Sequence, residues 1–232
     1  MSAIIGLFET VLVRDGMALR LDEHLERLLK SAAVNGLEVR DDPAEVRRRC
    51  LDLPNGRLRI ALVDGFMEVG VTPFPGYPED LYREGAVAIP ADTPGHPLGV
   101  RAGHKSLPYD VMIEARERAR ELGAIDVLFT DADGAILEGS VSNLFVVIEG
   151  VLITPPLTRP ILPGITRAAV LRLAGEMGIE AREADLFPPD LHEAEEAFLT
   201  SSLMLAMPLR EVGGTTLQPG SRAAEFRARL LV

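Results

Sequence analysis

A chain of 232 residues with 47% hydrophobic and 25% charged residues has the composition of an ordinary globular protein. Its formal net charge of −11 argues against a nucleic-acid partner, because a protein that binds phosphate backbones needs a basic face. A single cysteine, Cys50, excludes an intramolecular disulfide, and the short apolar runs predict neither a membrane span nor a signal peptide. We therefore expect a cytoplasmic protein that has no membrane or nucleic-acid partner.

The first part of the chain predicts an α+β unit. Residues 7–16 alternate in polarity and end in an Asp-Gly turn, which is typical of a strand entering a hairpin. Residues 22–36 carry leucines and alanines at helical spacing, with Asp22 as the expected N-cap and Gly36 as the stop. The next predicted elements are a helix and two successive strands of one sheet: residues 43–52, 57–65 and 67–75.

Residues 90–103 are dense in proline and glycine and have no periodicity, which indicates a crossing between two domains. We expect a small N-terminal domain over residues 1–95, a linker over 96–103 and a larger domain over 104–232. The larger domain predicts alternating helices and strands, in chain order: helix 109–122, strands 125–131, 135–138, 144–149 and 151–154, a helix from 164 to about 178, strand 179–186, a short helix at 190–195, strand 197–202, and a helix from 221.

Common catalytic signatures are absent from this sequence, among them GxSxG, the P-loop, HExxH and CxxC. The four histidines lack the spacing of metal ligands, so we expect surface or packing roles for them and no metal site: His24, His96, His104 and His192.

Lys105 is one of only two lysines in a chain with 22 arginines. Exposed cations exchange freely, but a lysine that must form an imine cannot become an arginine, because the guanidinium stays protonated. Lys105 therefore suggests covalent chemistry. Chance survival explains it equally well, as Lys30 on the exposed face of the first helix illustrates.

Two segments suit an anionic ligand. Gly164 lets backbone approach closely, and residues 164–166 open a helix whose first N–H groups and Thr166 hydroxyl favour an anion. Residues 199–203 place three hydroxyls at a strand end. Each segment alone also fits a plain cap or turn. Beside a nucleophilic lysine they suggest a phosphorylated aldehyde cofactor.

Glu138 ends a predicted strand just before a polar loop. A carboxylate there could keep the ring nitrogen of such a cofactor protonated, which lets the ring accept electrons. The alternative is that Glu138 is only a surface carboxylate of a hairpin.

Four ordered motifs, "HKSLPY", "DGAILEGSVSNLF", "ILPGITR" and "AFLTSS", resemble the class IV aminotransferase family, the fold-type IV pyridoxal-phosphate enzymes. The resemblance runs from about residue 5 to residue 213. This family contains branched-chain aminotransferases, D-amino-acid aminotransferases and 4-amino-4-deoxychorismate lyases. The resemblance implies the two-domain α+β fold of the D-amino-acid aminotransferases, in which a small α/β sandwich precedes a larger barrel-like domain. It also implies a homodimer with pyridoxal 5'-phosphate bound between the domains.

The resemblance assigns roles residue by residue. Lys105 matches the Schiff-base lysine, Glu138 the partner of the pyridine nitrogen, and Tyr109 a tyrosine that contacts the phenolic oxygen in several members. The matched phosphate ligands are Arg27, Ile165, Thr166 and Ser202, with Ser201 beside it, and Gly164 is the glycine before this helix that lets the backbone approach the cofactor. Members usually have another strand and turn before the segment that matches residues 6–13. We therefore expect the small domain to lack an edge strand, and the substrate side of the pocket to be more open or completed by a partner subunit.

The amino substrate and the reaction depend on weaker signals. Phe8 and Thr10 in "FET" resemble many deoxychorismate lyases, whereas branched-chain enzymes tend to carry glycine at the position of Thr10. Phe8 is either a wall of the pocket or a core residue, and the core is the simpler interpretation. Arg57 and Arg59 share one strand face and suit a substrate carboxylate, or an ion pair with an acidic residue. Against a lyase, Tyr109 fits an aminotransferase equally well, and residues 63–75 lack the arginine-rich turn of lyases and D-amino-acid enzymes. We favour 4-amino-4-deoxychorismate lyase. The alternatives are an aminotransferase for branched-chain or D-amino acids and a non-catalytic cofactor-binding homologue.

Overall fold

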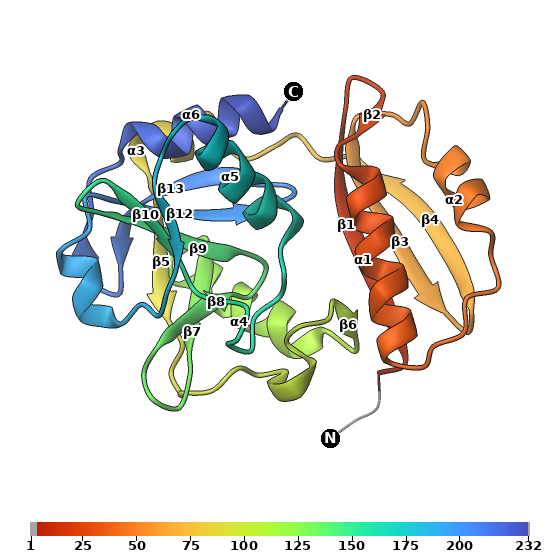
Figure 1. Ribbon diagram of the computed structural model, residues 1–232, viewed down its shortest axis with the longest axis horizontal. Helices are drawn as coiled ribbons and strands as arrows, with labels where there is room; N and C mark the ends of the chain where they lie inside the picture. The colour runs from red at the N-terminus through yellow and green to blue at the C-terminus, as the bar shows by residue number, and fades with distance from the viewer. Residues whose placement is uncertain (1–3, 232) are drawn as a thin grey trace. The chain divides into compact units, whose positions relative to one another are not determined.

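The computed structural model describes residues 4–231, in two compact units (Figure 1). Unit 1 comprises the residues up to Gly76 together with His104–Tyr109, and unit 2 comprises Tyr77–Gly103 and Asp110 onward. The units therefore do not coincide with the domains expected at residues 1–95 and 104–232, which stay a prediction.

Unit 1 contains a five-stranded sheet in the order β2-β1-β3-β4, with β6 paired to the other part of β1. Its strands are β1 (Gly6–Arg14), β2 (Met17–Ala18), β3 (Gly56–Val63), β4 (Phe66–Thr72) and β6 (Ser106–Leu107). The predicted hairpin at Asp15-Gly16 is confirmed, because both residues have positive φ and β1 pairs antiparallel with β2. The predicted pairing of two successive strands is confirmed in β3 and β4.

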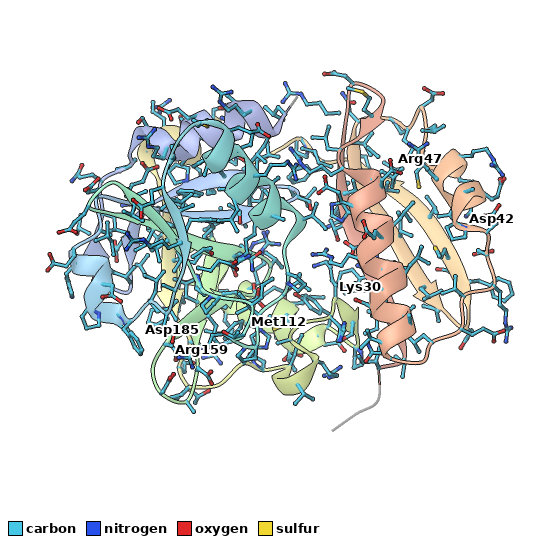
Figure 2. All side chains as sticks on the ribbon, in the orientation of Figure 1. Lys30, Asp42, Arg47, Met112, Arg159 and Asp185 are labelled. Carbon is cyan, nitrogen blue, oxygen red and sulfur yellow. The ribbon has the colours of Figure 1, made fainter. Side chains whose placement is uncertain are left out.

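Two helices cover one face of this sheet: α1 (Leu21–Val34) and α2 (Pro43–Arg49). Leucines of α1 and alternate residues of β1, β3 and β4 form a single apolar cluster. The prediction of Asp22 as N-cap is wrong: the helix begins at Leu21, after Arg20 in the left-handed region, and Asp22 lies in the first turn, where it pairs with Arg47. Asp42, labelled in Figure 2, is the N-cap of α2, and its Oδ1 accepts a hydrogen bond from the Ala44 N–H at 2.9 Å.

Unit 2 is built on six strands that close into a ring, β9-β12-β13-β5-β7-β8 and back to β9. These strands are β5 (Ala86–Pro90), β7 (Asp126–Thr130), β8 (Ile136–Gly139), β9 (Asn143–Ile148), β12 (Glu196–Ser201) and β13 (Leu205–Val212). Strands β10 (Val151–Thr154), β11 (Ala181–Glu183) and β14 (Thr215–Thr216) extend the sheet outside the ring. The predicted barrel-like domain is thus present.

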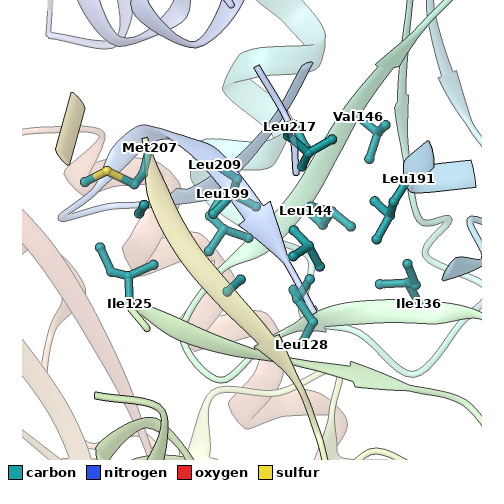
Figure 3. Packing of buried hydrophobic residues seen from close by; sticks show 14 of the residues in the cluster. Ile125, Leu128, Ile136, Leu144, Val146, Leu191, Leu199, Met207, Leu209 and Leu217 are labelled. Atoms are coloured by element: carbon teal, nitrogen blue, oxygen red, sulfur yellow. The ribbon is translucent and has the colours of Figure 1, made fainter. Parts of the chain in front are cut away.

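Apolar side chains from all six strands of the ring form one cluster, part of which Figure 3 shows. Leu144 and Leu199 belong to this cluster, whereas Phe145 and Phe198 point to the opposite face and stack at 5.2 Å. Phe226 of α6 (Ser221–Leu230) packs on Phe198 there. Helices α5 (Ile165–Glu176) and α6 lie over β12 and β13 (Figure 1). The alternation of the strands therefore separates the ring interior from the face covered by helices.

The other helical elements are α3 (Glu79–Glu84), α4 (Asp110–Glu121), and 3-10 turns at Gly99–Arg101 and Pro188–His192. On the surface of unit 2, Arg159 donates to Asp131, Asp133 and Asp185, and it lies beside Asp185 in Figure 2. Within residues 4–231 no helix is long and apolar enough to cross a membrane.

Candidate active-site residues

Lys105 directly precedes β6 in unit 1, where β6 pairs with β1. The Phe8 N–H donates to the Lys105 carbonyl at 2.9 Å, and this fixes the backbone of the lysine. The Lys105 Nζ atom lies 4.7 Å from the centroid of the Phe8 ring and 5.1 Å from that of Tyr109. The two rings meet edge to face, with centroids 5.0 Å apart. Lys105 thus projects between two aromatic walls that attract its ammonium.

Three of the four predicted substrate residues share one region of this sheet. The Arg59 Cζ atom lies 4.1 Å from the Phe8 ring centroid, and Arg59 pairs with Thr10 in the register of β1 and β3. Phe8, Thr10 and Arg59 therefore lie together on the sheet face that carries the aromatic wall of Lys105. Arg57 lies two residues before Arg59, near the start of β3, where its Nε donates to Thr72 Oγ1 at 3.2 Å.

Arg27 projects from α1 and is held by Glu9. Its Nε and Nη2 donate to Glu9 Oε1 and Oε2 at 2.8 and 2.6 Å, a two-point pair that fixes the plane of the guanidinium. The carboxylate accepts a further bond from His24 Nδ1 at 2.7 Å, and His24 and Glu9 are both buried. Burial by itself raises the pKa of Glu9, but Arg27 and His24 outweigh it and lower the pKa to about 2. Burial lowers the pKa of His24 although Glu9 opposes the shift. Nδ1 carries the hydrogen of this bond, because a carboxylate oxygen can only accept.

Replacing Glu9 by glutamine should make the free energy of unfolding depend less on pH below pH 4.5. Because the pKa of Glu9 falls from its usual 4.5 to about 2, its stabilisation is full above pH 4.5 and disappears as the pH drops toward 2. We expect Glu9→Gln to lower the free energy of unfolding by about 3 kcal/mol at pH 7 and to have little effect near pH 2. Urea titrations at pH 7, 5 and 3 measure this. The exposed Glu68→Gln is the control, and an equal loss for Glu9→Gln at all three pH values would contradict the prediction.

Glu138 lies near the end of β8 in unit 2, where it is 4% exposed. Three N–H groups meet its carboxylate: His96 Nε2 at 3.2 Å and the Leu162 backbone N–H at 2.9 Å on Oε1, and Asn143 Nδ2 at 3.0 Å on Oε2. The alternative of an exposed hairpin carboxylate is thereby wrong. Glu138 is a buried acceptor whose orientation is fixed by neutral donors.

Asn143 connects Glu138 with the segment that enters α5. Its Nδ2 donates to both Glu138 Oε2 and the Leu162 carbonyl, each at 3.0 Å. A Cβ atom on Gly164, the residue before α5, would lie 2.0 Å from Asn143 Oδ1, so only glycine fits there. Ile165 and Thr166 then open the first turn of α5, as predicted.

The two predicted serines lie at the end of β12, the neighbour of β9. Thr200 pairs with Asn143 across the two strands, so Ser201 follows directly beyond the level of the asparagine. Ser201 Oγ accepts the Met204 N–H at 3.2 Å in the turn to β13, and Ser202 lies in that turn. Glu138 and the hydroxyls at the end of β12 therefore lie on two strands that flank β9, and the start of α5 is joined to them through Asn143.

Asp126 anchors the loop between Glu138 and Asn143. Its fully buried carboxylate accepts the hydroxyls of Ser140 and Ser142 at 2.5 and 2.7 Å and the backbone N–H groups of Val127 and Ser140 at 2.9 and 3.0 Å. Both oxygens therefore meet only donors.

An amide at position 126 should destabilise unit 2. In Asp126→Asn the new NH2 group would face hydroxyl and N–H donors in a buried site, so we expect a loss of about 3 kcal/mol in the free energy of unfolding. Chemical denaturation of the apo-protein measures the loss. The matched control is Asp92→Asn on the exposed surface, where we expect a change within about 0.5 kcal/mol. Equal stability of the two variants would show that the acceptor role of Asp126 is unimportant.

Five buried residues around Arg27 in unit 1 and Glu138 in unit 2 were not predicted as site residues: Glu9, His24, His96, Asp126 and Asn143. Surface or packing roles were expected for all four histidines, and His24 and His96 are buried. Asn143 offered a local signal, since an asparagine rarely opens an apolar strand unless its amide is bonded. The other partners come from segments distant in sequence, which no local pattern connects.

Known proteins resemble this chain over nearly its whole length. A family model described as amino-transferase class IV matches residues 6–212. A D-alanine aminotransferase of Bacillus licheniformis is 32% identical over 237 residues, which cover 93% of this chain and 82% of the relative. A bifunctional aminodeoxychorismate lyase / D-amino acid transaminase of Mycobacterium tuberculosis is 32% identical over 254 residues, which cover 97% and 88%.

Among solved structures, the branched-chain amino acid aminotransferase of Escherichia coli superposes with a TM-score of 0.87 at 26% identity, over 98% of this chain and 84% of that one. The match of fold and the match of sequence thus agree over nearly the whole chain. The predicted resemblance is confirmed, and the chain belongs to the class IV aminotransferase family.

Proposed function

We propose that Lys105 holds the pyridoxal 5'-phosphate of this protein covalently and that Glu138 keeps its ring nitrogen protonated. The enzymes of this family depend on this cofactor. When bound, it supplies an aldehyde that condenses with amines and a ring that accepts the electron pair of a broken bond. The residues fit the group by their chemistry: a lysine amine, a buried carboxylate, and hydroxyl and N–H donors for phosphate.

Glu138 supports the electron-accepting state of the ring. A carboxylate that is buried among neutral donors keeps its charge for a cationic partner, and a protonated ring nitrogen is such a partner. For the phosphate we propose Arg27, whose guanidinium is fixed by Glu9, and the α5 turn at Gly164, Ile165 and Thr166. Ser201 and Ser202 add hydroxyls.

Lys105 would have a second task once its amine is free again in the presence of the substrate. Its amine then takes the proton from the carbon next to the substrate nitrogen. The rings of Phe8 and Tyr109 limit the directions that this side chain can take. We assign the Tyr109 hydroxyl to the cofactor's phenolic oxygen, as the family resemblance implies.

For the reaction we propose elimination of pyruvate from 4-amino-4-deoxychorismate, which gives 4-aminobenzoate. The observation that carries this choice is that Thr10 and Arg59 are register partners on β1 and β3, with Arg59 over the Phe8 ring. This places a hydroxyl and a guanidinium on one sheet face, which suits a ring substrate with carboxylates. The relative from Mycobacterium tuberculosis is named as both a lyase and a transaminase, so it supports either reaction. Amino transfer is the second candidate, and the D-alanine aminotransferase of Bacillus licheniformis favours it.

One pair of assays decides between the candidates. The purified holoenzyme is given aminodeoxychorismate, and 4-aminobenzoate is measured. In parallel it is given glutamate, leucine or D-alanine with a keto acid, and amino transfer is measured. Formation of 4-aminobenzoate at the higher kcat/KM supports the lyase, and keto-acid products alone would refute it. Cofactor binding without either product would support a non-catalytic homologue. A colourless protein that cannot be reconstituted with pyridoxal phosphate would refute both enzyme proposals.

We also propose that the protein is a homodimer, and sedimentation of the purified protein would measure its oligomeric state.

A further inference from the structure

His96 lies in the segment that joins β5 to the 3-10 turn at Gly99–Arg101, and its side chain is 1% exposed. Backbone bonds on both sides hold this segment. The Gly95 N–H donates to the Thr130 carbonyl at 2.7 Å, and the Gly99 N–H donates to the His96 carbonyl at 2.9 Å. The imidazole packs on Phe129 with ring centroids 5.3 Å apart. The ring therefore has a fixed position inside unit 2.

The contacts of the ring determine which nitrogen carries the proton. The Leu98 backbone N–H donates to Nδ1 at 3.1 Å, so Nδ1 is an acceptor without a hydrogen. The other nitrogen, Nε2, lies 3.2 Å from Glu138 Oε1, which as a carboxylate oxygen accepts. His96 is thus the neutral Nε2–H tautomer. A proton on Nδ1 as well would set two donors, the imidazolium N–H and the Leu98 N–H, against each other.

A neutral donor has a different effect from a cation at this carboxylate. An imidazolium would neutralise Glu138 and compete with a protonated ring nitrogen for its charge. A neutral N–H fixes the carboxylate plane and leaves the charge in place. We propose that His96 is a positioning residue for Glu138, and that Leu98 keeps it neutral so that Glu138 can pair with the cofactor ring. This inference rests on the role proposed for Glu138 above.

Two substitutions of His96 separate its two hydrogen bonds. The side-chain nitrogen of glutamine reaches the place of Nε2, so His96→Gln keeps a donor for Glu138. The side-chain oxygen of asparagine reaches the place of Nδ1, so His96→Asn keeps only the acceptor for Leu98. Glu138→Gln is made in parallel, all in the full chain. The readouts are the dissociation constant for pyridoxal phosphate added to apo-protein, the wavelength of the visible band, and the apo-protein Tm.

We expect His96→Asn to weaken cofactor binding about 10-fold and to move the visible band in the same direction as Glu138→Gln. We expect His96→Gln to stay within about 3-fold of the parent protein and to keep the band. A purely structural role would lower the apo-protein Tm in both variants and leave the band unchanged, and that result would overturn the inference. If Glu138→Gln itself changes neither binding nor band, the role proposed for Glu138 fails first.

A second measurement does not depend on the folding of any variant. Nitrogen NMR of labelled imidazoles in the holoenzyme distinguishes the two neutral tautomers and the cation, and His96→Gln assigns the signal. We expect the neutral Nε2–H form at pH 7. An imidazolium or an Nδ1–H tautomer would overturn the proposed arrangement.

Discussion

Replacing Lys105 by arginine removes the borohydride-sensitive visible band of the holoenzyme and lowers turnover of the amino substrate by at least about 10³-fold. Arginine keeps the positive charge and reaches the same aromatic walls, Phe8 and Tyr109. Its guanidinium stays protonated, so it neither condenses with an aldehyde nor removes a proton from carbon. The expected loss is therefore chemical and leaves the fold intact.

The chain provides a matched control for this substitution. Lys30, the other lysine, is exposed on α1 (Figure 2), so Lys30→Arg is the same exchange at a site without proposed chemistry. We expect its band, turnover and Tm to equal those of the parent protein. Absorbance spectra before and after borohydride, with steady-state rates, test both variants. A Lys105→Arg protein that keeps the band would show that another amine holds the cofactor.

Much of the fold follows from periodicity, and what escaped prediction has physical causes. Strand β13 was missed because Pro208 interrupts an apolar run, and proline argues against a strand with two neighbours. In the structure Pro208 pairs with Phe198, and the strand carries an irregularity between Leu209 and Glu211 where it meets β5. The five-residue β5 has no polar alternation to mark it as a strand.

The site residues also divide into those that local sequence predicts and those that it does not. Those assigned from motifs, such as Lys105 and Thr166, lie in short segments whose chemistry shows in the sequence alone. Apart from Asn143, those that were missed act as partners across longer sequence distances, such as Glu9 with Arg27 on α1 and His96 with Glu138 on β8. A buried carboxylate reveals its role only through its donors, and tertiary packing supplies them.

Two of the buried glutamates, Glu9 and Glu138, show how those donors determine charge. Glu9 is paired with a guanidinium, which lowers its pKa and compensates its charge within unit 1. The named partners of Glu138 are neutral N–H groups, which orient its charge without cancelling it. Glu9 is therefore suited to holding Arg27 in place, whereas Glu138 is suited to holding a cationic partner that arrives with the cofactor.

Replacing Asn143 by aspartate should disrupt the arrangement around Glu138 strongly. The amide gives one hydrogen to Glu138 Oε2 and one to the Leu162 carbonyl, both at 3.0 Å. A carboxylate would face an anion and a carbonyl oxygen with no hydrogen to give, in a site that is 4% exposed. We expect a loss of about 3 to 5 kcal/mol in the free energy of unfolding at pH 8 and no measurable cofactor binding.

The effect should depend on pH, because two carboxyl groups that share one proton avoid the repulsion between them. The stability lost in Asn143→Asp should therefore be smaller at pH 5 than at pH 8, whereas Asn143→Ala, which removes the donors without adding charge, should lose a similar amount at both. Asn55→Asp in an exposed loop is the control for the charge itself. Denaturation curves of the apo-proteins and cofactor titrations at the two pH values give the comparison. Equal losses for Asn143→Asp at pH 5 and pH 8 would contradict a direct interaction between residue 143 and Glu138.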